Sequence, residues 1–307
     1  MNSLRVPAFA KVNLRLDVLG RRPDGYHELR TIFQSLSLHD TLHITRTRGA
    51  GIELRVAGNA ALSQTPAHDN LVWRAAAAIR KELKLSGGVR VVLRKRIPVA
   101  RGLGGGSSDA AATLAGVLRL SGRRIAPGRL LEIAASLGAD VPFFLLGGRA
   151  LGTGRGDEID PLPDMAPRPV LVVSPSGIAV STPDAYRWLK RGLTKAQTPF
   201  KLWSFCALCW SPQESSLAND FEDPVFRRHP RLGRIRRALL QQGAVEAALA
   251  GSGSAVFGLF RNPAQARRSA RMFPEDEVFL CRTLSRKAHV RALWGSLSPA
   301  LERERRR

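Results

Sequence analysis

The segment Ile97–Ser121, IPVARGLGGGSSDAAATLAGVLRLS, constrains the fold of this chain more than any other. Glycines at 102, 104, 105 and 106 and serines at 107 and 108 lead directly into a run of small and apolar residues. Glycine admits positive φ angles and lets backbone amides approach a ligand without a Cβ between them. The first turn of a helix directs unpaired N–H groups and the positive end of its dipole at the preceding loop. The segment therefore predicts a phosphate-binding loop at a helix N-terminus.

Two other interpretations of this loop are weaker. A P-loop carries a Lys-Ser/Thr pair after its last glycine, which is absent here, and the GxGxxG of dinucleotide-binding domains occurs in a different sequence context. A flexible glycine linker is the remaining alternative, but such linkers do not run straight into a helical stretch such as Asp109–Leu118. We therefore favour an anion-binding loop.

Length and charge bound the possible partners. The 307 residues suffice for one large or two ordinary domains. A net charge of +23 favours nucleotides, phosphorylated metabolites, nucleic acid or acidic lipid. The basic residues are spread along the whole chain up to the final RERRR, so charge alone does not choose among these partners. No apolar run reaches the roughly eighteen residues of a membrane span, and the first residues lack a secretory pattern. We expect a cytoplasmic protein without membrane attachment.

The three cysteines give little indication of function. Cys206 and Cys209 form a lone CxxC in an apolar, Trp-flanked stretch, and Cys281 stands apart. A zinc site needs a second pair of ligands, which the sequence does not offer. We expect buried, reduced thiols.

Apolar periodicity predicts both strands and helices. Residues 8–18 alternate, with Ala8, Ala10 and Val12 on one face and Lys11 and Asn13 on the other, as in a strand with one buried face. Further strands are predicted at Thr41–Arg46, Ile52–Val56, Val89–Leu93, Val170–Ser174, Ser254–Leu259 and Val278–Thr283. Helices are predicted at Asp69–Leu83 (with Asp69 or Asn70 near its cap), after the glycine loop, at Pro127–Leu137, Pro183–Lys190, Pro230–Gln242 and Pro263–Met272, and at the end of the chain.

A cluster of prolines divides the chain. Pro161, Pro163, Pro167 and Pro169 fall within nine residues, a density typical of a domain boundary. We therefore predict an α+β protein with two domains, residues 1–163 and 164–307.

Seven short segments together resemble the GHMP small-molecule kinases, and they occur in family order over nearly the whole chain. They are Ala8–Leu14, Pro23–His27, Asp69–Leu71, Gly102–Ala111, Gly138–Phe143, Asn219–Glu222 and Ala250–Ala255. The resemblance implies a two-domain GHMP kinase fold, with a ribosomal-protein-S5-domain-2-like N-terminal domain and a ferredoxin-like C-terminal domain. It also implies an ATP-dependent kinase that uses Mg²⁺ and phosphorylates a small-molecule alcohol.

Within the family, Tyr26-His27 and the segment 219–222 resemble the subgroup that recognises a cytosine ring. The implied substrate is a cytidine diphosphate derivative of methylerythritol, phosphorylated at its 2-hydroxyl in isoprenoid precursor synthesis. Cytosine would stack between aromatic side chains, with Tyr186 as the second of them. Because aromatic faces hold bases without discriminating among them, His27 would supply the selectivity. For Tyr186, a helix core residue is the alternative.

The resemblance also assigns the catalytic residues. Lys11 would lie beside the acceptor hydroxyl and the reacting phosphate, where a positive charge stabilises the transferring phosphoryl group. Asn13 would hold the substrate's polyol, and Asp140 would accept the hydroxyl proton. Without the resemblance, the sequence favours an ordinary solvated lysine on the exposed face of a strand for Lys11. For Asp140, which precedes Val141-Pro142 in an expected extended turn, the alternative is the common role of a turn-forming or capping residue.

For the nucleotide, the resemblance implies contacts from the phosphate loop and from the start of the helix near residue 70. Asn70 and Leu71 would lie near the adenosine, although a cap and a core residue are the alternative. Arg101 stands where relatives have a small residue, either as an extra phosphate contact or pointing to solvent. Ser107 or Ser108 could reach Mg²⁺, whose protein ligands stay unassigned. The loop residues concerned are Pro98, Val99, Ala100, Arg101, Gly102, Leu103, Gly104, Gly105, Gly106, Ser107 and Ser108.

Two other functions compete with this one. The first is another GHMP kinase, acting on homoserine, mevalonate or a sugar. The second is a nucleic-acid-binding protein, suggested by the charge, although the chain has no RNP, KH or zinc-finger pattern. We expect no specific nucleic acid partner, and both a monomer and a homodimer stay open. Gly251–Gly253 either lines the site near the phosphate or makes only a tight turn.

Overall fold

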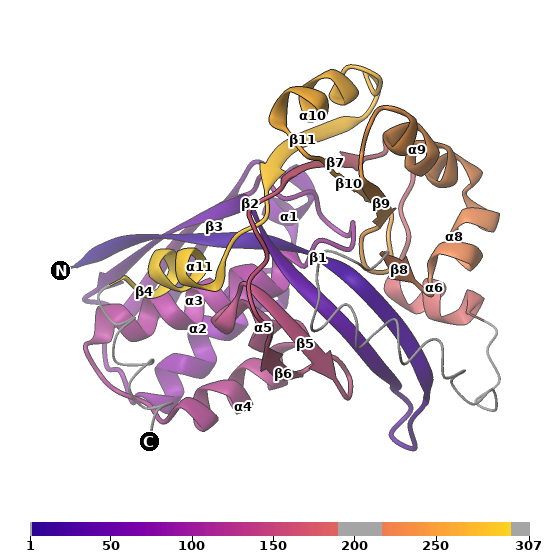
Figure 1. The fold of residues 1–307 in the computed structure, drawn as a ribbon. Helices are drawn as coiled ribbons and strands as arrows, with labels where there is room; N and C mark the ends of the chain where they lie inside the picture. The colour runs from indigo at the N-terminus through magenta and orange to yellow at the C-terminus, as the bar shows by residue number, and fades with distance from the viewer. Residues whose placement is uncertain (1, 190–216, 296–307) are drawn as a thin grey trace.

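The computed structural model describes residues 2–189 and 217–295 and contains two β-sheets (Figure 1). The larger sheet is ordered β3-β4-β2-β1-β8, with β5 pairing β2 and β6 pairing β5. Its centre is the long antiparallel hairpin of β1 and β2, the end of which projects away from the helices in Figure 1. Its strands are β1 (Ser3–Arg21), β2 (His27–Thr47), β3 (Ile52–Ala57), β4 (Gly88–Arg94), β5 (Arg149–Thr153), β6 (Glu158–Pro161) and β8 (Ala218–Asn219).

Helices pack on one face of this sheet. They are α2 (Leu71–Glu82), α3 (Gly105–Ser121), α4 (Pro127–Leu137) and α5 (Val141–Leu146). The short helix α1 (Ala60–Gln64), which has no buried residue, and a 3₁₀ turn at Ala67–Asp69 connect β3 to α2. The helix α3 is almost wholly buried, and its Gly116 lies so close to the sheet that a Cβ there would be 2.3 Å from Ile44 Cδ1. Glycine at this position therefore brings α3 against β2 and fixes the phosphate loop that precedes it.

The smaller sheet is antiparallel in the order β11-β7-β10-β9. Its strands are β7 (Pro169–Ser174), β9 (Glu246–Leu249), β10 (Val256–Leu259) and β11 (Glu277–Arg282). The helices of this part are α6 (Thr182–Trp188), α8 (Glu222–Arg228), α9 (Pro230–Gln241) and α10 (Pro263–Ala270). A shared apolar core joins the two sheets, with Val12 and Ile32 from the larger sheet and Val172 and Phe257 from the smaller one.

Two elements from the second part of the described chain pack against the larger sheet and its helices. The short strand β8 pairs in parallel with β1, and α11 (Arg286–Trp294) packs its Leu293 and Trp294 into the core around α3. The predicted boundary between residues 163 and 164 lies just before β7, and it stays a prediction.

Each strand and helix that the sequence predicts has a counterpart in the structure, although β2 begins well before the predicted Thr41–Arg46. The sequence does not predict the elements α1, α5, α8, β5, β6, β8 and β9. The expectation that β1 has a single buried face is wrong, because residues 8–18 are buried on both faces. Register shifts after Phe9 and after Asn13 interrupt the alternation, and the polar side chains bond one another, as Arg15 Nε does with Asp17 at 3.1 Å. The polar face of β1 is therefore interior, and part of it borders a cavity.

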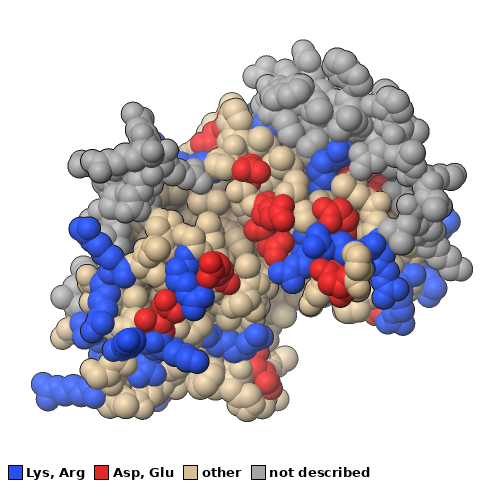
Figure 2. Space-filling model, turned by 90° about the horizontal axis from the view of Figure 1, so that it is seen from below, with Lys and Arg blue, Asp and Glu red and all other residues tan. Residues whose placement is uncertain are grey.

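The remaining sequence predictions concern cysteines, membrane spans and charge. Cys206 and Cys209 lie outside the described residues, whereas Cys281 on β11 is a free thiol whose pKa burial raises to about 12. Among residues 2–189 and 217–295, none of the helices combines the length and apolar character of a membrane span. On the face shown in Figure 2, Lys and Arg lie in several groups with Asp and Glu between them.

Candidate active site

A cavity of about 1010 Å³ lies between the phosphate loop, the polar face of β1 and the start of α6. It brings together nearly all the predicted site residues from distant parts of the chain. Ser108 is the exception, because it is 2% exposed in the first turn of α3 and does not line the cavity. The predicted residues in the lining are Lys11, Asn13, Tyr26, His27, Asn70, Leu71, Pro98, Val99, Ala100, Arg101, Gly102, Leu103, Gly104, Gly105, Gly106, Ser107, Asp140 and Tyr186.

Lys11 is buried at the wall of this cavity, with only 4% of the residue exposed. Its Nζ donates to Asn13 Oδ1 at 2.8 Å, and Asn13 Nδ2 donates to Thr31 Oγ1 at 2.7 Å. Thr31 Oγ1 in turn donates to the Arg15 carbonyl oxygen at 2.7 Å. This chain of hydrogen bonds fixes the ammonium in place, and the alternative of a solvated surface lysine is wrong.

Asp140 approaches the same point from a different element. Its Oδ2 lies 3.6 Å from Lys11 Nζ, and about a third of its side chain (32%) is exposed. The expected extended turn at Val141-Pro142 is wrong, because these residues begin α5 and Asp140 is its N-cap. Proline is tolerated in the first turn of a helix, where its missing N–H would have no intrahelical partner. The carboxylate is therefore held beside the ammonium yet open to a ligand.

The phosphate loop is shaped by close packing that only glycine permits. Gly102 and Gly104 have φ angles of 77° and 71°. A Cβ on Gly102 would lie 1.8 Å from the Ala250 carbonyl oxygen, and one on Gly104 would lie 2.6 Å from the Phe144 ring and 3.1 Å from Lys11 Cγ. Gly104 is also the N-cap of α3. The first turn of α3 thus begins beside Lys11, with Gly104, Gly105 and Gly106 at the cavity surface.

A loop from the second sheet closes the site. Asn219 Nδ2 donates to the carbonyl oxygens of Leu249 and Gly251, at 3.0 and 2.7 Å, and so holds the turn that follows β9. A Cβ on Gly251 would be 3.2 Å from Lys11 Nζ, so this turn lies against the ammonium. The sequence marked residues 219–222 only as a family segment, whereas the structure shows that Asn219 positions a wall of the cavity.

Arg101 connects the phosphate loop to the same turn. Its Nη1 donates to Ser254 Oγ at 2.6 Å, and Ser254 Oγ donates to the Ile178 carbonyl oxygen at 2.7 Å. The sequence left two possibilities for Arg101, and the one in which its side chain points to solvent is wrong. Nothing in the sequence pairs residue 101 with residue 254, because they are distant in the chain.

Asn70 and Leu71 occupy the outer part of the cavity. Asn70 Oδ1 accepts from Val72 N at 2.9 Å and so caps α2, as the alternative interpretation of this residue expected. Leu71 packs at the edge of the larger core, near Gly106. Both residues also line the cavity, so their local role is compatible with a contact to a bound ligand.

Aromatic rings gather at the other end of the cavity. His27 and Tyr186 stack with centroids 4.3 Å apart and planes 17° apart, and Tyr186 also meets Phe221 edge-on. Tyr26 is 57% exposed and has the Arg155 guanidinium 5.1 Å above its ring. The structure therefore places His27, and not Tyr26, against Tyr186.

The electrostatics of these rings follow from their burial. Burial, together with the positive charge of Arg21, lowers the pKa of His27 below its usual range. Burial and the nearby Asp140 carboxylate raise the pKa of Tyr186. Near neutral pH both rings are therefore uncharged, which suits them to contact an uncharged base.

The polar groups at the phosphate end fit a nucleotide with its metal ion. Within the described ranges no group of three or more His, Cys, Asp or Glu side chains could hold a metal ion by itself. Ser107 and Asp140 do present oxygen atoms to the cavity, the kind of donor that Mg²⁺ prefers alongside phosphate oxygens. The glycines of the loop line the cavity and pack closely against the protein behind them.

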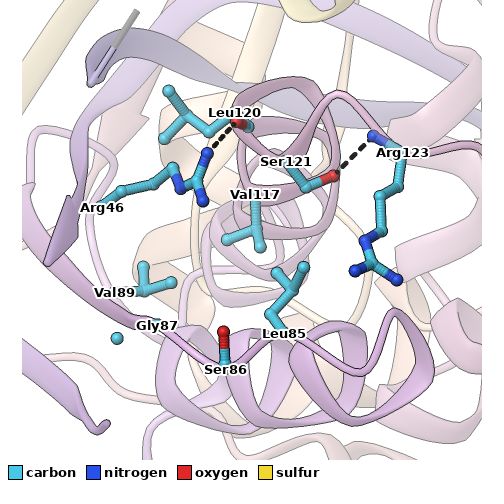
Figure 3. Close-up of a pocket in the computed structure, with 10 residues that line it drawn as sticks. Arg46, Leu85, Ser86, Gly87, Val89, Val117, Leu120, Ser121 and Arg123 are labelled. Atoms are coloured by element: carbon cyan, nitrogen blue, oxygen red, sulfur yellow. Dashed lines mark hydrogen bonds between the residues drawn. The ribbon is translucent and has the colours of Figure 1, made fainter. Parts of the chain in front are cut away.

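A second cavity, of about 180 Å³, lies at the far end of α3 (Figure 3). Arg46 Nη1 donates to the Leu120 carbonyl oxygen across it at 3.5 Å, and Arg123 N donates to Ser121 Oγ. None of the predicted site residues lines it. The larger cavity is therefore the candidate active site.

A glycine-lined helix N-terminus beside a buried ammonium and an accessible carboxylate is suited to phosphoryl transfer to a small molecule. The comparisons with known proteins agree. The family model "GHMP kinases N terminal domain" matches residues 70–148, and "GHMP kinases C terminal" matches residues 206–276. The chain belongs to the GHMP kinase family, whose members use ATP, and has the family's two-domain α+β fold.

Individual relatives refine this assignment. The 4-diphosphocytidyl-2-C-methyl-D-erythritol kinase of Solibacter usitatus is 47% identical over 94% of this chain and 90% of the relative. A crystal structure of 4-(cytidine 5'-diphospho)-2C-methyl-D-erythritol kinase has a TM-score of 0.76 at 36% identity and covers 91% of this chain and 99% of that one. Homoserine kinase from Cytophaga hutchinsonii, at 17% identity and a TM-score of 0.69 (93% and 95% covered), shares the fold.

Proposed function

We propose that this chain is an ATP-dependent kinase that phosphorylates the 2-hydroxyl of 4-diphosphocytidyl-2-C-methyl-D-erythritol, in the methylerythritol phosphate pathway of isoprenoid precursor synthesis. The observation that carries the proposal is the position of Lys11 Nζ, 3.6 Å from Asp140 Oδ2 and beside the glycine loop, in a cavity that His27 and Tyr186 also line. The similarity to curated kinases of this name over most of the chain supports the choice of substrate.

In this proposal Asp140 orients the acceptor hydroxyl. The acceptor oxygen attacks the γ-phosphorus, the bond from that phosphorus to the β,γ-bridging oxygen breaks, and the hydroxyl proton passes to the carboxylate. Because Asp140 is partly exposed and makes no side-chain cap to α5, its oxygens are available to a substrate. A base must lie within hydrogen-bond reach of the proton that it takes, about 3 Å.

Lys11 supplies positive charge where the phosphoryl group passes. Phosphoryl transfer depends mainly on positioning and on stabilisation of the phosphoryl oxygens. The ammonium is already fixed by Asn13, so little reorganisation accompanies the reaction. Asn13 can turn its remaining hydrogen-bonding capacity to the substrate's polyol.

The nucleotide phosphates would lie along Pro98–Ser107, with the N–H groups of the first turn of α3 directed at them. Mg²⁺ would be held by the phosphates and by Ser107, and when bound it neutralises charge on the phosphate oxygens. Asn70 and Leu71 border the place for the adenosine. Ser108 is not assigned a contact, because it is buried.

The base end would receive the cytosine ring. Tyr26 and Tyr186 offer aromatic faces, and neutral His27 can both donate and accept hydrogen bonds along the base edge. In the structure His27 covers one face of Tyr186, so a base that stacks on that face displaces the imidazole. A cytoplasmic location and a monomer or homodimer stay predictions.

The test is a coupled assay of ADP release. The purified protein with ATP, Mg²⁺ and the cytidyl substrate should release ADP, and the Asp140→Ala variant should not. Turnover no faster than this variant would reject the proposal. Parallel assays with homoserine and mevalonate, which lack the cytidyl group, should show no comparable rate, and faster turnover of either would favour another kinase of the same family.

A further inference from the structure

Three buried charged side chains lie directly beneath the phosphate loop. Lys95 Nζ is 2.5 Å from Asp40 Oδ2 and 2.7 Å from Asp109 Oδ2. The side chains of Lys95, Asp40 and Asp109 are at most 4% exposed. They come from three separate elements: the end of β4, the middle of β2 and the first turns of α3. An arrangement this buried is costly unless each charge is paired.

The group holds the two ends of the loop together. Asp40 Oδ1 accepts hydrogen bonds from the backbone N–H groups of Arg96 and Ile97, at 2.5 and 2.8 Å, where the chain enters the loop. Asp109 belongs to α3, where the chain leaves the loop. Because Lys95 bonds both carboxylates, it ties the entrance of the loop to its exit.

The same lysine also supports the first turn of α3. A Cβ on Gly105 would lie 3.3 Å from Lys95 Nζ and 3.1 Å from Ile97 Cγ2, so the first turn of α3 rests on these two side chains. Both Lys95 and Asp109 reach the inner wall of the cavity. Any displacement of the lysine therefore displaces the amide groups proposed to face the phosphates.

The group places one ammonium between two carboxyl groups. Burial disfavours the Lys95 ammonium, but the carboxylates of Asp109 and Asp40 outweigh it and raise the pKa of the lysine. Burial, opposed by Lys95, raises the pKa of Asp109 well above its usual range. Lys95 therefore stays charged and engaged with its two partners, unlike Lys11, which is placed to act on the substrate.

We propose that Asp40, Lys95 and Asp109 are positioning residues that hold the phosphate loop in its nucleotide-binding shape before the nucleotide arrives. This inference rests on the proposed function, since it takes the loop to bind ATP. The proposal predicts that the three side chains affect the affinity for the nucleotide and do not affect the affinity for the acceptor alcohol.

The test compares two substitutions that each replace a buried carboxyl group with an amide of the same shape. Asp109→Asn weakens the interaction of residue 109 with Lys95. Asp276→Asn is the matched control, because Asp276 is 3% exposed and paired with Arg231 at 2.9 Å, but lies outside the cavity lining. We expect Asp109→Asn to raise the KM for ATP and the Kd of a non-hydrolysable ATP analogue about tenfold, with the acceptor KM changed less than about twofold. Asp276→Asn should lower the melting temperature and leave the ATP KM unchanged.

Several results would overturn the proposal. These are an unchanged ATP affinity in folded Asp109→Asn, equal losses for ATP and acceptor, or an equal loss in Asp276→Asn. If Asp109→Asn does not fold, hydrogen exchange of the wild-type protein provides the test. The backbone amides of Arg96 and Ile97 should be protected from exchange in the absence of nucleotide. Exchange of these amides at the rate of an unfolded chain would contradict the proposal. Analogue binding is measured without acceptor, so a wild type that binds the analogue but does not turn over would reject the proposed function alone.

Discussion

The two ends of the cavity differ in how firmly the protein holds them. At the phosphate end, Lys11 is 4% exposed and bonded through Asn13 to Thr31, while Gly104 packs on Phe144 without room for a methyl group. At the base end, Tyr26 is 57% exposed on the turn between β1 and β2, and its ring faces the Arg155 guanidinium.

The difference fits the roles proposed for the two ends. Stabilising a developing charge requires groups that are already in place, since any reorganisation during the reaction raises the barrier. Binding a flat base tolerates movement, because stacking depends on contact area more than on an exact position. The structure therefore suggests a fixed catalytic end and an adaptable recognition end, and the predictions below test that contrast.

The largest effect is expected from Lys11→Met, which removes the fixed charge but keeps the length of the side chain. We expect kcat to fall about 10³-fold, with the KM of the cytidyl substrate changed less than about threefold. Steady-state kinetics measures both. Lys81→Met on the exposed face of α2 is the control and should leave kcat unchanged. A loss confined to KM would mean that Lys11 binds substrate without aiding the chemical step.

The packing behind the phosphate loop should also be sensitive to acid. His289 does not line the cavity but is buried, with Nε2 donating to the Phe144 carbonyl oxygen at 2.8 Å and Nδ1 3.1 Å from Ser35 Oγ. Burial lowers its pKa to about 4, below the ordinary value of 6.5 that holds in the unfolded chain. Between these values the unfolded state binds the extra proton, so stability falls as the pH falls, by about 3 kcal/mol.

Urea unfolding at a series of pH values between 6.5 and 4 measures this dependence. The variant His289→Gln lacks the titrating group and should show a flatter curve over the same range. His68→Gln, which changes an exposed side chain (69%), is the control and should follow the wild type. If wild type and His289→Gln had parallel curves, burial of His289 would not be the cause.

At the adaptable end, His27→Ala should act on binding. Loss of the ring and its hydrogen bonds should raise the KM of the cytidyl substrate about tenfold to a hundredfold, because a stacked or bonded base contact contributes about 1–3 kcal/mol. We expect kcat to change less than about threefold, since His27 is assigned to base recognition and not to the reacting atoms. An unchanged KM would refute the assignment of base recognition to this end.

The smallest effect is expected from Arg101→Ala. It removes one hydrogen bond, to Ser254, between the phosphate loop and the turn beyond β9, so we expect the KM for ATP to rise about threefold. Ser254→Ala should give a similar change, and the double variant should be no worse than either single one. Additive losses would show that Arg101 acts on the nucleotide independently of Ser254.

Much of the fold could be predicted because the signals are local. The glycine loop before α3, the cap at Asn70 and the apolar alternation of β4 each depend on neighbouring residues. The helix α5 and the strand β8 could not be predicted in this way. The first is only six residues long, and the second consists of two residues held by pairing with β1.

The site shows the same division. The predicted site residues could be named from short motifs, and the structure brings all of them but Ser108 to the surface of the cavity. The partners that hold them could not, because they are distant in sequence: Asn219 with Gly251, Arg101 with Ser254, and Asp40 with Lys95. Such pairs appear only when the chain is folded. The stacking of His27 on Tyr186 is a further example, since the sequence favoured Tyr26 for the aromatic role.

A crystal structure with a non-hydrolysable ATP analogue and the cytidyl substrate bound together tests the account most directly. We predict the 2-hydroxyl oxygen within about 3 Å of an Asp140 carboxylate oxygen, with Lys11 Nζ between that hydroxyl and the γ-phosphate, and the phosphates along Pro98–Ser107. A complex in which the 2-hydroxyl lies far from Asp140, or in which the phosphates lie outside the glycine loop, would contradict it.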